Sequence, residues 1–139
     1  MLGHDTIEQS LRDYYQSERL QDLYECEKCK KKTKATKSTY ITKAPNFLIL
    51  VLRKFSPVTF KKIEDRLSYN FDLSLKRFCK GHAGDTHYTL QSLIIHKGPK
   101  SNKGHYYTFS KRGPRNVIFS LMQEWFYFND DSVKQIDEK

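Results

Sequence analysis

The sequence predicts an α+β fold that consists mostly of antiparallel β-sheet with a short helical start. Three observations support this prediction: runs rich in β-branched and aromatic residues recur along the chain, turn-rich segments separate them, and apolar residues recur at helical spacing near the N-terminus. The 139 residues match one domain or a piece of one, without an internal repeat or a Ser/Pro-rich linker.

A short helix is predicted close to the N-terminus. Thr6 or Asp5 is expected to cap its first turn, because a side-chain oxygen there accepts a hydrogen bond from a backbone N–H. The residue three positions later, Gln9 or Glu8, is expected to bond back to the cap. The apolar residues that recur at helical spacing and form one face are Ile7, Leu11 and Tyr14 or Tyr15.

Strands are predicted where β-branched and aromatic residues cluster between turn signals. The apolar run Phe47–Leu52 is expected to be a central strand covered on both faces, because it is continuous and of strand length. The other predicted strands are 38–42, one edge strand within 63–75, 88–96, 105–110 and 125–128. Loops are expected over 78–85 and 97–104, and 111–124 is expected to supply extra packing or an additional strand.

The chain is basic, with 25 lysine and arginine residues against 16 aspartate and glutamate residues, a formal net charge of +9. Six lysines lie within the ten residues 28–37, which favours an acidic partner such as nucleic acid. A solvated hairpin tip explains the same run, and no aromatic residue is interleaved to stack on bases. Both interpretations of this lysine run stay open.

Three cysteines, an odd number with one closely spaced pair, argue against a disulfide scaffold. The N-terminus has no basic flank with an apolar core, and the longest apolar run is too short to span a bilayer. We therefore expect a reduced protein of the cytoplasm, the nucleus or both, without a membrane partner.

Cys26 and Cys29 have the two-residue spacing that lets two thiolates bind one Zn²⁺ from a tight turn. A structural zinc site needs four ligands, so this pair supplies half of one. Cys79 and His82 have the same spacing, so a Cys₃His site within the chain is one alternative. Two reduced thiols without metal are the other.

His105 begins one predicted strand, and Asn129 ends a later one. If the two strands are antiparallel neighbours, the start of the first lies opposite the end of the second. The Asn129 carboxamide oxygen is then expected to accept a hydrogen bond from Nδ1 of His105, leaving Nε2 to face a nucleophile. Asp130 is expected to take over as orienting residue or to polarise a water. The alternative is that His105 is a surface histidine and that Asn129 and Asp130 form an ordinary turn. The two other histidines that flank a predicted strand, His87 and His96, are expected to be hydrogen-bonded structural histidines.

Six strings of residues form together a more specific signature than any one motif. They are YECEKC at 24–29, APNFLILVLRKF at 44–55, YTL at 88–90, HKG at 96–98, GHYY at 104–107 and WFYFND at 125–130. With these strings the chain resembles, over nearly its whole length, the ubiquitin-specific proteases, a family of papain-like thiol hydrolases. The resemblance implies the palm and part of the fingers of the catalytic domain, with the thumb absent. It divides the chain into a helical lead-in over 1–23, a finger with the zinc knuckle over 24–43, and a palm with the histidine box over 44–139.

The resemblance implies a deubiquitinase that cleaves after the C-terminal glycine of ubiquitin, with ubiquitin and ubiquitinated proteins as partners. It implies that His105 is the general base, that Asn129 orients it and that Asp130 assists. Gly104 is expected to admit the extended ubiquitin tail, and Tyr106 to line its channel. The second pair of zinc ligands is expected outside the chain.

The family's nucleophilic cysteine and its oxyanion-hole amide belong to a cysteine box far upstream of the histidine box, and the sequence contains neither. Cys79 lacks that context and is expected to be a packing residue or a loop thiol. We therefore expect the chain to need an upstream N-terminal half of the catalytic domain as a partner and to be inactive alone. A non-catalytic zinc-ribbon module that binds ubiquitin or nucleic acid is the alternative.

Overall fold

The computed structural model describes residues 6–113 and 124–137. The chain falls into two compact units: the first runs up to Ile49 and includes Asp65–Thr89, and the second combines Leu50–Glu64 with the chain from Leu90 onward. Antiparallel strand pairs dominate both units, and the described residues add one α-helix and one 3₁₀ helix. The predicted α+β, mostly antiparallel class is thus confirmed.

The first unit contains the helix α1 (Ile7–Tyr14). The Thr6 hydroxyl oxygen caps this helix by accepting a hydrogen bond of 3.1 Å from the Gln9 backbone N–H. The Gln9 side chain donates instead to Asp13 Oδ1 at 3.0 Å, so the predicted return bond to the cap is wrong. A residue four positions later in a helix competes well for a side-chain amide, which explains the difference. Asp5, the alternative cap, lies outside the described residues.

The apolar face of α1 continues into Tyr15, which packs against the small core of the first unit. Its ring stacks on Phe78 with a centroid distance of 5.1 Å, whereas Tyr14 is 72% exposed. Phe78 ends the 3₁₀ helix η1 (Lys76–Phe78), which directly follows the fully buried Leu75. Of the two tyrosines predicted for this face, Tyr15 therefore occupies it.

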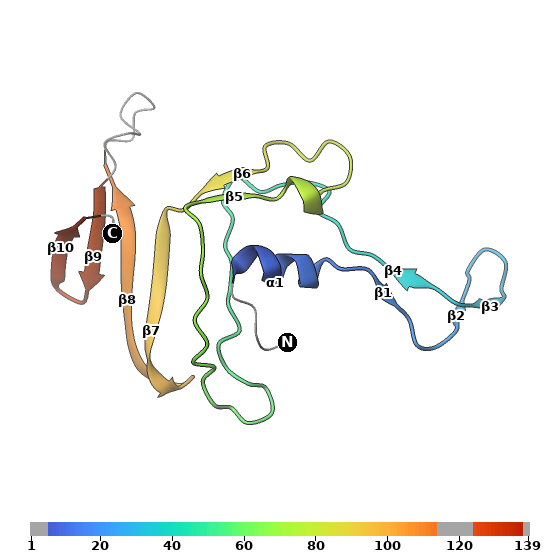
Figure 1. Cartoon of the computed structure of the whole chain (residues 1–139), viewed down its shortest axis with the longest axis horizontal. Coiled ribbons are helices and arrows are strands. Elements are labelled where there is room, and N and C mark those ends of the chain that lie inside the picture. The colour runs from blue at the N-terminus through green and yellow to red at the C-terminus, as the bar shows by residue number, and fades with distance from the viewer. Residues whose placement is uncertain (1–5, 114–123, 138–139) are drawn as a thin grey trace. The chain divides into compact units, whose positions relative to one another are not determined.

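Two short antiparallel ladders form a ribbon in the first unit. β1 (Glu18–Arg19) pairs with β4 (Thr36–Lys37). The chain that connects these two strands forms the second ladder, in which β2 (Tyr24–Glu25) pairs with β3 (Lys32–Thr33) (Figure 1). All the strand residues are exposed, so backbone pairing holds this ribbon without a core of its own. The strand predicted over 38–42 is wrong, because β4 ends at Lys37 and within 38–42 only Ile41 pairs, in an isolated parallel bridge with Cys79.

A separate two-stranded sheet in the first unit pairs β5 (Asp72–Ser74) with β6 (His87–Thr89). It confirms the edge strand predicted within 63–75. The single strand predicted over 88–96 is wrong, because the segment belongs to two strands in different sheets. β6 ends at Thr89, two residues follow that belong to no strand, and the next strand then begins in another sheet.

The second unit contains a four-stranded antiparallel sheet in the order β10–β9–β8–β7, whose strands lie side by side in Figure 1. The strands are β7 (Ser92–Lys100), β8 (Lys103–Arg112), β9 (Glu124–Asn129) and β10 (Ser132–Ile136). The strands predicted over 105–110 and 125–128 are confirmed as the central parts of β8 and β9.

The turn between β7 and β8 is much shorter than predicted. Both strands continue into the predicted loop 97–104, so that only a two-residue turn joins them. The ladder has a register irregularity between Lys97 and Lys100, and Gly98 and Pro99 lie within it. Glycine and proline therefore mark a bulge here and not a loop.

One face of the four-stranded sheet carries a cluster of aromatic rings. The Tyr127 ring centroid lies 5.5 Å from that of Tyr107 and 5.4 Å from that of Phe109. Farther along β9, Trp125 is only 5% exposed, and the Lys111 ammonium lies 5.4 Å from its ring centroid. Trp125 therefore belongs to the buried core.

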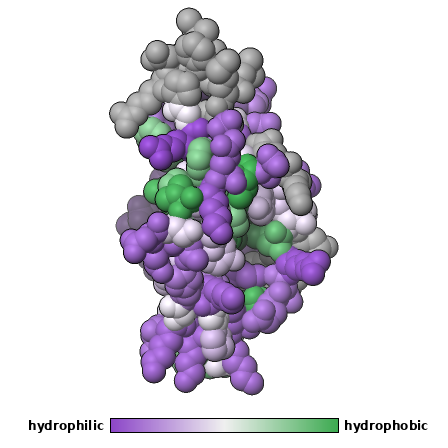
Figure 2. All heavy atoms as spheres, turned by 90° about the vertical axis from the view of Figure 1, so that its left-hand side faces the viewer, coloured by the Kyte–Doolittle hydropathy of each residue, from purple (hydrophilic) through white to green (hydrophobic). Residues whose placement is uncertain are grey.

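The central strand predicted over Phe47–Leu52 is wrong. No residue of the run belongs to a strand, and Phe47, Ile49 and Val51 are 87%, 83% and 84% exposed. A central strand needs pairing partners along both edges, and no strand of residues 6–113 and 124–137 pairs with this run. The face of the molecule seen in Figure 2 carries apolar patches, drawn in green, between hydrophilic side chains, drawn in purple.

Part of the connection between β8 and β9 was predicted to supply packing or a strand within 111–124. Its apolar groups, 117–119 and 121–122, lie outside the described residues. Where the structure describes the chain, α1 is the only α-helix, and no helix is long and apolar enough to cross a membrane.

Candidate active site

His105 and Asn129 lie on the same face of the four-stranded sheet. In the β8–β9 ladder Thr108 pairs with Phe128, and side chains alternate between the faces along each strand. Continuing this register makes His105 and Asn129 diagonal neighbours on the face that carries the aromatic cluster. The antiparallel adjacency predicted for these two strands is confirmed.

The two side chains are in hydrogen-bond contact: Nε2 of His105 meets Oδ1 of Asn129, and both residues are half-buried. The predicted assignment of the ring nitrogens is wrong, because Nε2 and not Nδ1 faces the carboxamide. A carboxamide oxygen only accepts, so Nε2 carries the proton in this contact and Nδ1 carries the lone pair. Nδ1 is therefore the atom left for a nucleophile. The neutral Asn129 fixes the tautomer and the orientation of the ring without adding a charge.

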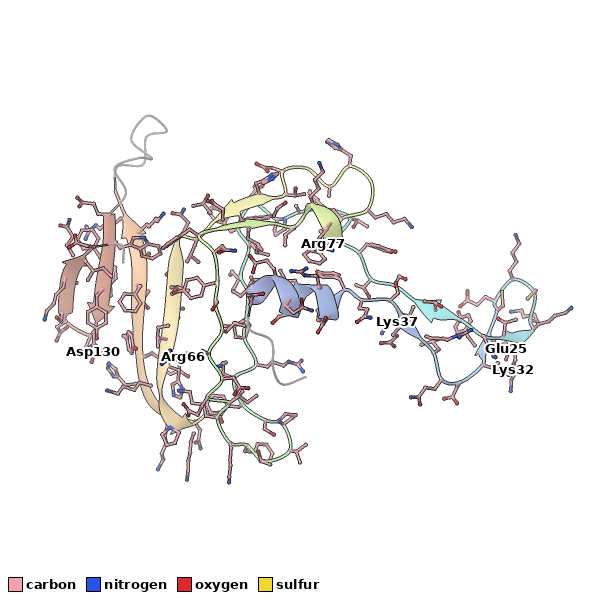
Figure 3. The ribbon with its side chains drawn as sticks, in the orientation of Figure 1. Glu25, Lys32, Lys37, Arg66, Arg77 and Asp130 are labelled. Atoms are coloured by element: carbon pink, nitrogen blue, oxygen red, sulfur yellow. The ribbon has the colours of Figure 1, made fainter. Side chains whose placement is uncertain are left out.

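Asp130 lies in the two-residue turn that joins β9 to β10, and Figure 3 labels it there. Asn129 pairs with Ser132 across this turn. Asp130 has a φ of 49°, a left-handed conformation that aspartate tolerates better than most residues and that tight hairpin turns require. It is exposed, and no hydrogen bond joins it to His105 or Asn129 among the described residues. Its assisting role stays a prediction.

The aromatic cluster supports the His105–Asn129 pair from within the same sheet. Tyr107 follows His105 by two positions and Tyr127 precedes Asn129 by two, so the four side chains share one face. The contact between the Tyr107 and Tyr127 rings holds β8 and β9 together beside the pair. The imidazole and the amide are thus positioned by packed strands and not by a loop.

The Tyr106 side chain points from β8 to the opposite face, where His96 of β7 lies. A side chain at position 104 would point to the same face. His96 pairs with Tyr106 in the ladder, and their ring centroids are 4.7 Å apart. Tyr106 is 58% exposed. A Cβ atom at Gly104 would overlap Nε2 of His96 and would lie 2.7 Å from the Lys97 carbonyl oxygen. Packing inside the chain therefore requires this glycine, whereas the roles of Gly104 and Tyr106 toward the ubiquitin tail stay predictions.

Cys26 and Cys29 lie in the tight turn between β2 and β3. This turn is closed by backbone hydrogen bonds of 2.8 Å from Lys30 N–H to the Cys26 carbonyl and 3.0 Å from Cys26 N–H to the Lys31 carbonyl. Hydrogen bonds from the backbone N–H groups of Cys29 and Lys28, and from the Cys29 thiol, lower the pKa of Cys26 below its ordinary value. Donors aimed at a thiolate suit a structural metal ligand, so the pair fits half of a zinc site.

The structure does not bring Cys79 and His82 to this pair. Within residues 6–113 and 124–137, no group of three or more histidine, cysteine, aspartate or glutamate side chains is placed to hold a metal ion. The Cys79 thiol donates to the Leu75 carbonyl oxygen at 3.2 Å and is half-buried. This contact supports the predicted packing role of Cys79.

The lysine run 28–37 lies on the ribbon of the first unit, and all of its lysines are exposed. Figure 3 labels Lys32 opposite Glu25, its partner in the β2–β3 ladder. The Lys37 ammonium lies 3.8 Å from a Glu18 carboxylate oxygen in the β1–β4 ladder. Opposite charges across both ladders agree with the solvated interpretation, and a nucleic-acid partner stays a prediction.

Comparison with known proteins identifies the family. A model of the family described as ubiquitin carboxyl-terminal hydrolase matches residues 3–139. The chain belongs to this family. Ubiquitin carboxyl-terminal hydrolase 23 of Arabidopsis thaliana is 30% identical over 97% of this hydrolase-family chain, which spans 15% of that relative. Ubiquitin carboxyl-terminal hydrolase 17-like protein E of Mus musculus is 32% identical over 95% of the chain, which spans 24% of that relative.

Solved structures of the same family share the fold. The SAGA Ubp8/Sgf11/Sus1/Sgf73 DUB module bound to ubiquitin aldehyde aligns with a TM-score of 0.80 and 27% identity over 99% of the chain, which spans 31% of that solved chain. A second SAGA DUB module, bound to monoubiquitin, aligns with a TM-score of 0.79 and 29% identity over 96% of the chain and 29% of its own length. The resemblance to the ubiquitin-specific proteases is therefore confirmed, and this hydrolase-family chain spans less than a third of each of these proteins.

Proposed function

We propose that the chain is the C-terminal part of the catalytic domain of a thiol-dependent deubiquitinase that cleaves after the terminal glycine of ubiquitin. The observation that carries the proposal is the contact between His105 and Asn129, which holds the ring by Nε2 and leaves Nδ1 for a thiol. The similar solved DUB modules are bound to ubiquitin aldehyde or monoubiquitin, which supports ubiquitin as the partner. The same proposal includes the division of the chain into a helical lead-in over 1–23, a finger over 24–43 and a palm over 44–139. It also includes a location in the cytoplasm, the nucleus or both.

In the proposed mechanism, a cysteine from the upstream part of the catalytic domain attacks the carbonyl carbon of the terminal glycine. Nδ1 of His105 takes the thiol proton and later returns a proton to the departing lysine amine. Water then hydrolyses the thioester with His105 acting as base. Asn129 accepts the Nε2–H hydrogen bond throughout, and the thiolate balances the imidazolium charge that the neutral amide cannot balance.

The sequence supplies no cysteine box and no oxyanion-hole amide, so the proposed reaction needs the upstream half of the domain. A histidine and an amide without a nucleophile offer no covalent route to hydrolysis. We therefore expect the isolated chain to leave a ubiquitin C-terminal reporter intact.

Within the same proposal, Cys26 and Cys29 hold a structural zinc ion together with two ligands from outside the chain. Zinc would crosslink the tip of a ribbon whose strands have no core to hold them. Zinc content of the domain assembled from both halves tests this assignment: one ion is expected, and Cys26→Ser should remove it. A full complement of zinc in the Cys26→Ser protein would contradict it.

The proposed function is tested by fusing the chain to the cysteine-box half of a family member and measuring cleavage of a fluorogenic ubiquitin C-terminal reporter. The fusion should cleave the reporter, and His105→Ala should lower kcat/KM by at least about 10³-fold, the size of a lost general base. His87→Ala removes an exposed histidine of the first unit and serves as the matched control, with no expected loss. Cleavage that survives His105→Ala would overturn the proposal, and ubiquitin binding without cleavage would favour the non-catalytic module.

A further inference from the structure

A half-buried histidine on the face opposite to His105, whose two ring nitrogens are buried, has no role in the mechanism above. We propose that this residue, His96, is a positioning residue that holds the start of β8, and with it His105, in the catalytic geometry. The proposal also assigns the glycine at position 104 to the His96 ring and not to the approach of a substrate. It rests on the proposed function of His105.

The His96 ring is held firmly at the irregular end of the β7–β8 ladder. His96 pairs with Tyr106, and the next pair along is Lys97 with His105, so the two histidines project to opposite faces. The ring lies between the aromatic rings of Tyr106 and Phe55, at centroid distances of 4.7 and 5.8 Å. The backbone is held as well, because the Lys62 ammonium donates to the His96 carbonyl oxygen at 2.9 Å.

The nitrogens of the His96 imidazole do not hold the ring in its place. Nδ1 and Nε2 are both buried, and neither has a hydrogen-bond partner among the described residues. This corrects the expectation of a hydrogen-bonded structural histidine. A buried polar atom without a partner loses its hydration without compensation, so an aromatic ring of similar shape without nitrogens would be cheaper to bury. What the surrounding structure uses is therefore the shape and place of the ring.

The His96 ring lies against two glycines at the end of the ladder. A Cβ atom at Gly104 would overlap Nε2 of His96 and lie 2.9 Å from its Cδ2, so the ring fills the space that a side chain there would take. A Cβ atom at Gly98 would lie 3.4 Å from the same Nε2. The bulge of β7 and the first residues of β8 thus close directly on the ring.

The consequence for His105 follows from its position in the chain. Gly104 immediately precedes His105, so the place of the Gly104 Cα atom fixes where the His105 side chain starts. A shift of this backbone would separate Nε2 of His105 from Oδ1 of Asn129, because a contact across two strands tolerates little displacement. His96 therefore acts on the catalytic pair through the backbone.

A double-mutant cycle on the 139-residue chain tests the proposal, with the ¹⁵N NMR signals of the His105 ring as the readout. In the parent chain, these signals should show the Nε2–H tautomer bonded to Asn129. Gly104→Ala should abolish this signature by forcing the His96 ring out. Combining it with His96→Ala should restore the signature in part, since the new methyl group then enters the vacated space. Restoration stays partial because the Lys97 carbonyl oxygen still lies 2.7 Å from the new Cβ.

Three comparisons make the result decisive. His96→Phe keeps a ring without nitrogens and should preserve the His105 signature, and His87→Ala should not change it. A double variant no better than Gly104→Ala, or a parent-like signature in Gly104→Ala, would overturn the proposal. So would loss of the signature in His96→Phe with the sheet intact by backbone NMR, because the nitrogens would then matter.

The fused enzyme separates this inference from the proposed function. A positioning role predicts that Gly104→Ala lowers kcat and that His96→Ala partly restores it, whereas a role in admitting the ubiquitin tail predicts a raised KM that His96→Ala leaves unchanged. The NMR cycle needs no activity. An inactive fusion with the cycle intact would refute the proposed function alone, and an active fusion without coupling would refute the positioning role alone.

Discussion

At the scale of single residues, the contact between His105 and Asn129 gives the two ring nitrogens different tasks. Nε2 contacts the Asn129 oxygen, and in the proposed mechanism Nδ1 exchanges a proton with the thiol. Asn129 contributes only a hydrogen-bond acceptor of fixed position. Any side chain that offers an acceptor at the same place should therefore preserve the orientation of the ring.

Asn129→Ala should lower kcat/KM of the fused enzyme by about 10²-fold, because the ring loses the partner that keeps it in its reactive orientation. Asn129→Asp should keep most of the activity, since a carboxylate oxygen accepts the same Nε2–H bond. Reporter cleavage measured across pH provides the comparison. Equal losses in both variants would show that more than an acceptor is needed.

Cys26 should react as a thiolate at lower pH than an ordinary cysteine. The backbone N–H groups of Cys29 and Lys28 and the Cys29 thiol lower its folded-state pKa. The sign of the linkage follows: the stabilisation is present above the unfolded-state pKa and is lost as the pH falls through the lowered folded-state pKa. Iodoacetamide labelling of the chelator-treated chain, followed by mass spectrometry, measures the reactivity of Cys26 across pH. Half-maximal reactivity should occur at a lower pH in the folded chain than in the chain unfolded by urea.

The control for Cys26 is Cys29→Ser, which removes the thiol contribution and keeps the backbone donors. It should raise the labelling midpoint only in part, because the Cys29 backbone N–H is the largest cause of the lowered pKa. Identical midpoints for the folded and unfolded chains would contradict the assignment.

The sequence was sufficient to name the His105–Asn129 pair but not to orient it. Strand order and antiparallel neighbourhood predict which residues meet, because they depend on hydrophobic pattern and turns. The rotation of an imidazole depends on the atoms packed around it, and no residue pattern records them. The same limit explains Gly104, whose constraint comes from the His96 ring across a bulge that the sequence does not reveal.

At the scale of elements, the β9–β10 turn decides where Asn129 ends its strand. The two-residue turn places Asp130 at a φ of 49°, which costs most side chains about 1 kcal/mol or more. The backbone requirement of this turn is independent of any chemistry by the Asp130 carboxylate. Substitutions at Asp130 can therefore separate the two.

Asp130→Gly should keep or slightly raise the stability of the chain, because glycine adopts positive φ without a steric cost. Asp130→Val should lower the free energy of unfolding by about 1–2 kcal/mol, since a β-branched residue resists this conformation. Urea unfolding measures both. Asp130→Gly with full stability but low reporter cleavage would assign a chemical role to the carboxylate, whereas equal stability of the two variants would contradict the turn argument.

Among the elements, the strands rich in aromatic residues were predicted well, whereas β10 and the two-residue strands β1 to β4 were not predicted. β8 and β9 were recognisable because clustered aromatic residues and flanking turns mark them. The run Phe47–Leu52 has an equally strong strand composition but no pairing partner in the described residues. Composition reports a preference for pairing, and pairing itself needs a second strand.

At the scale of the whole molecule, the chain is a family member that spans less than a third of its relatives. Phe47, Ile49 and Val51 are more than four-fifths exposed, although large apolar side chains gain free energy from burial. Under the proposed function, this exposure is expected of residues that pack against the upstream part of the catalytic domain.

Ile49→Ser and Val51→Ser should leave the stability of the isolated chain unchanged and weaken its association with the cysteine-box half by about tenfold each. The reason is that these side chains gain burial only in the complex, at about 1.5–3 kcal/mol for a full side chain. Titration calorimetry of the two halves measures the association. Val58→Ser is the matched control, because Val58 is also 83% exposed and lies in a different segment. Unchanged affinity for Ile49→Ser and Val51→Ser would contradict this use of the exposed run.

The most direct test is an experimental structure of the chain joined to the cysteine-box half of the domain and trapped with ubiquitin aldehyde. We predict that Nδ1 of His105 lies within hydrogen-bond reach of the nucleophilic sulfur while Nε2 stays on Oδ1 of Asn129. A structure in which Nε2 faces the sulfur, or in which His105 has turned away from Asn129, would contradict it.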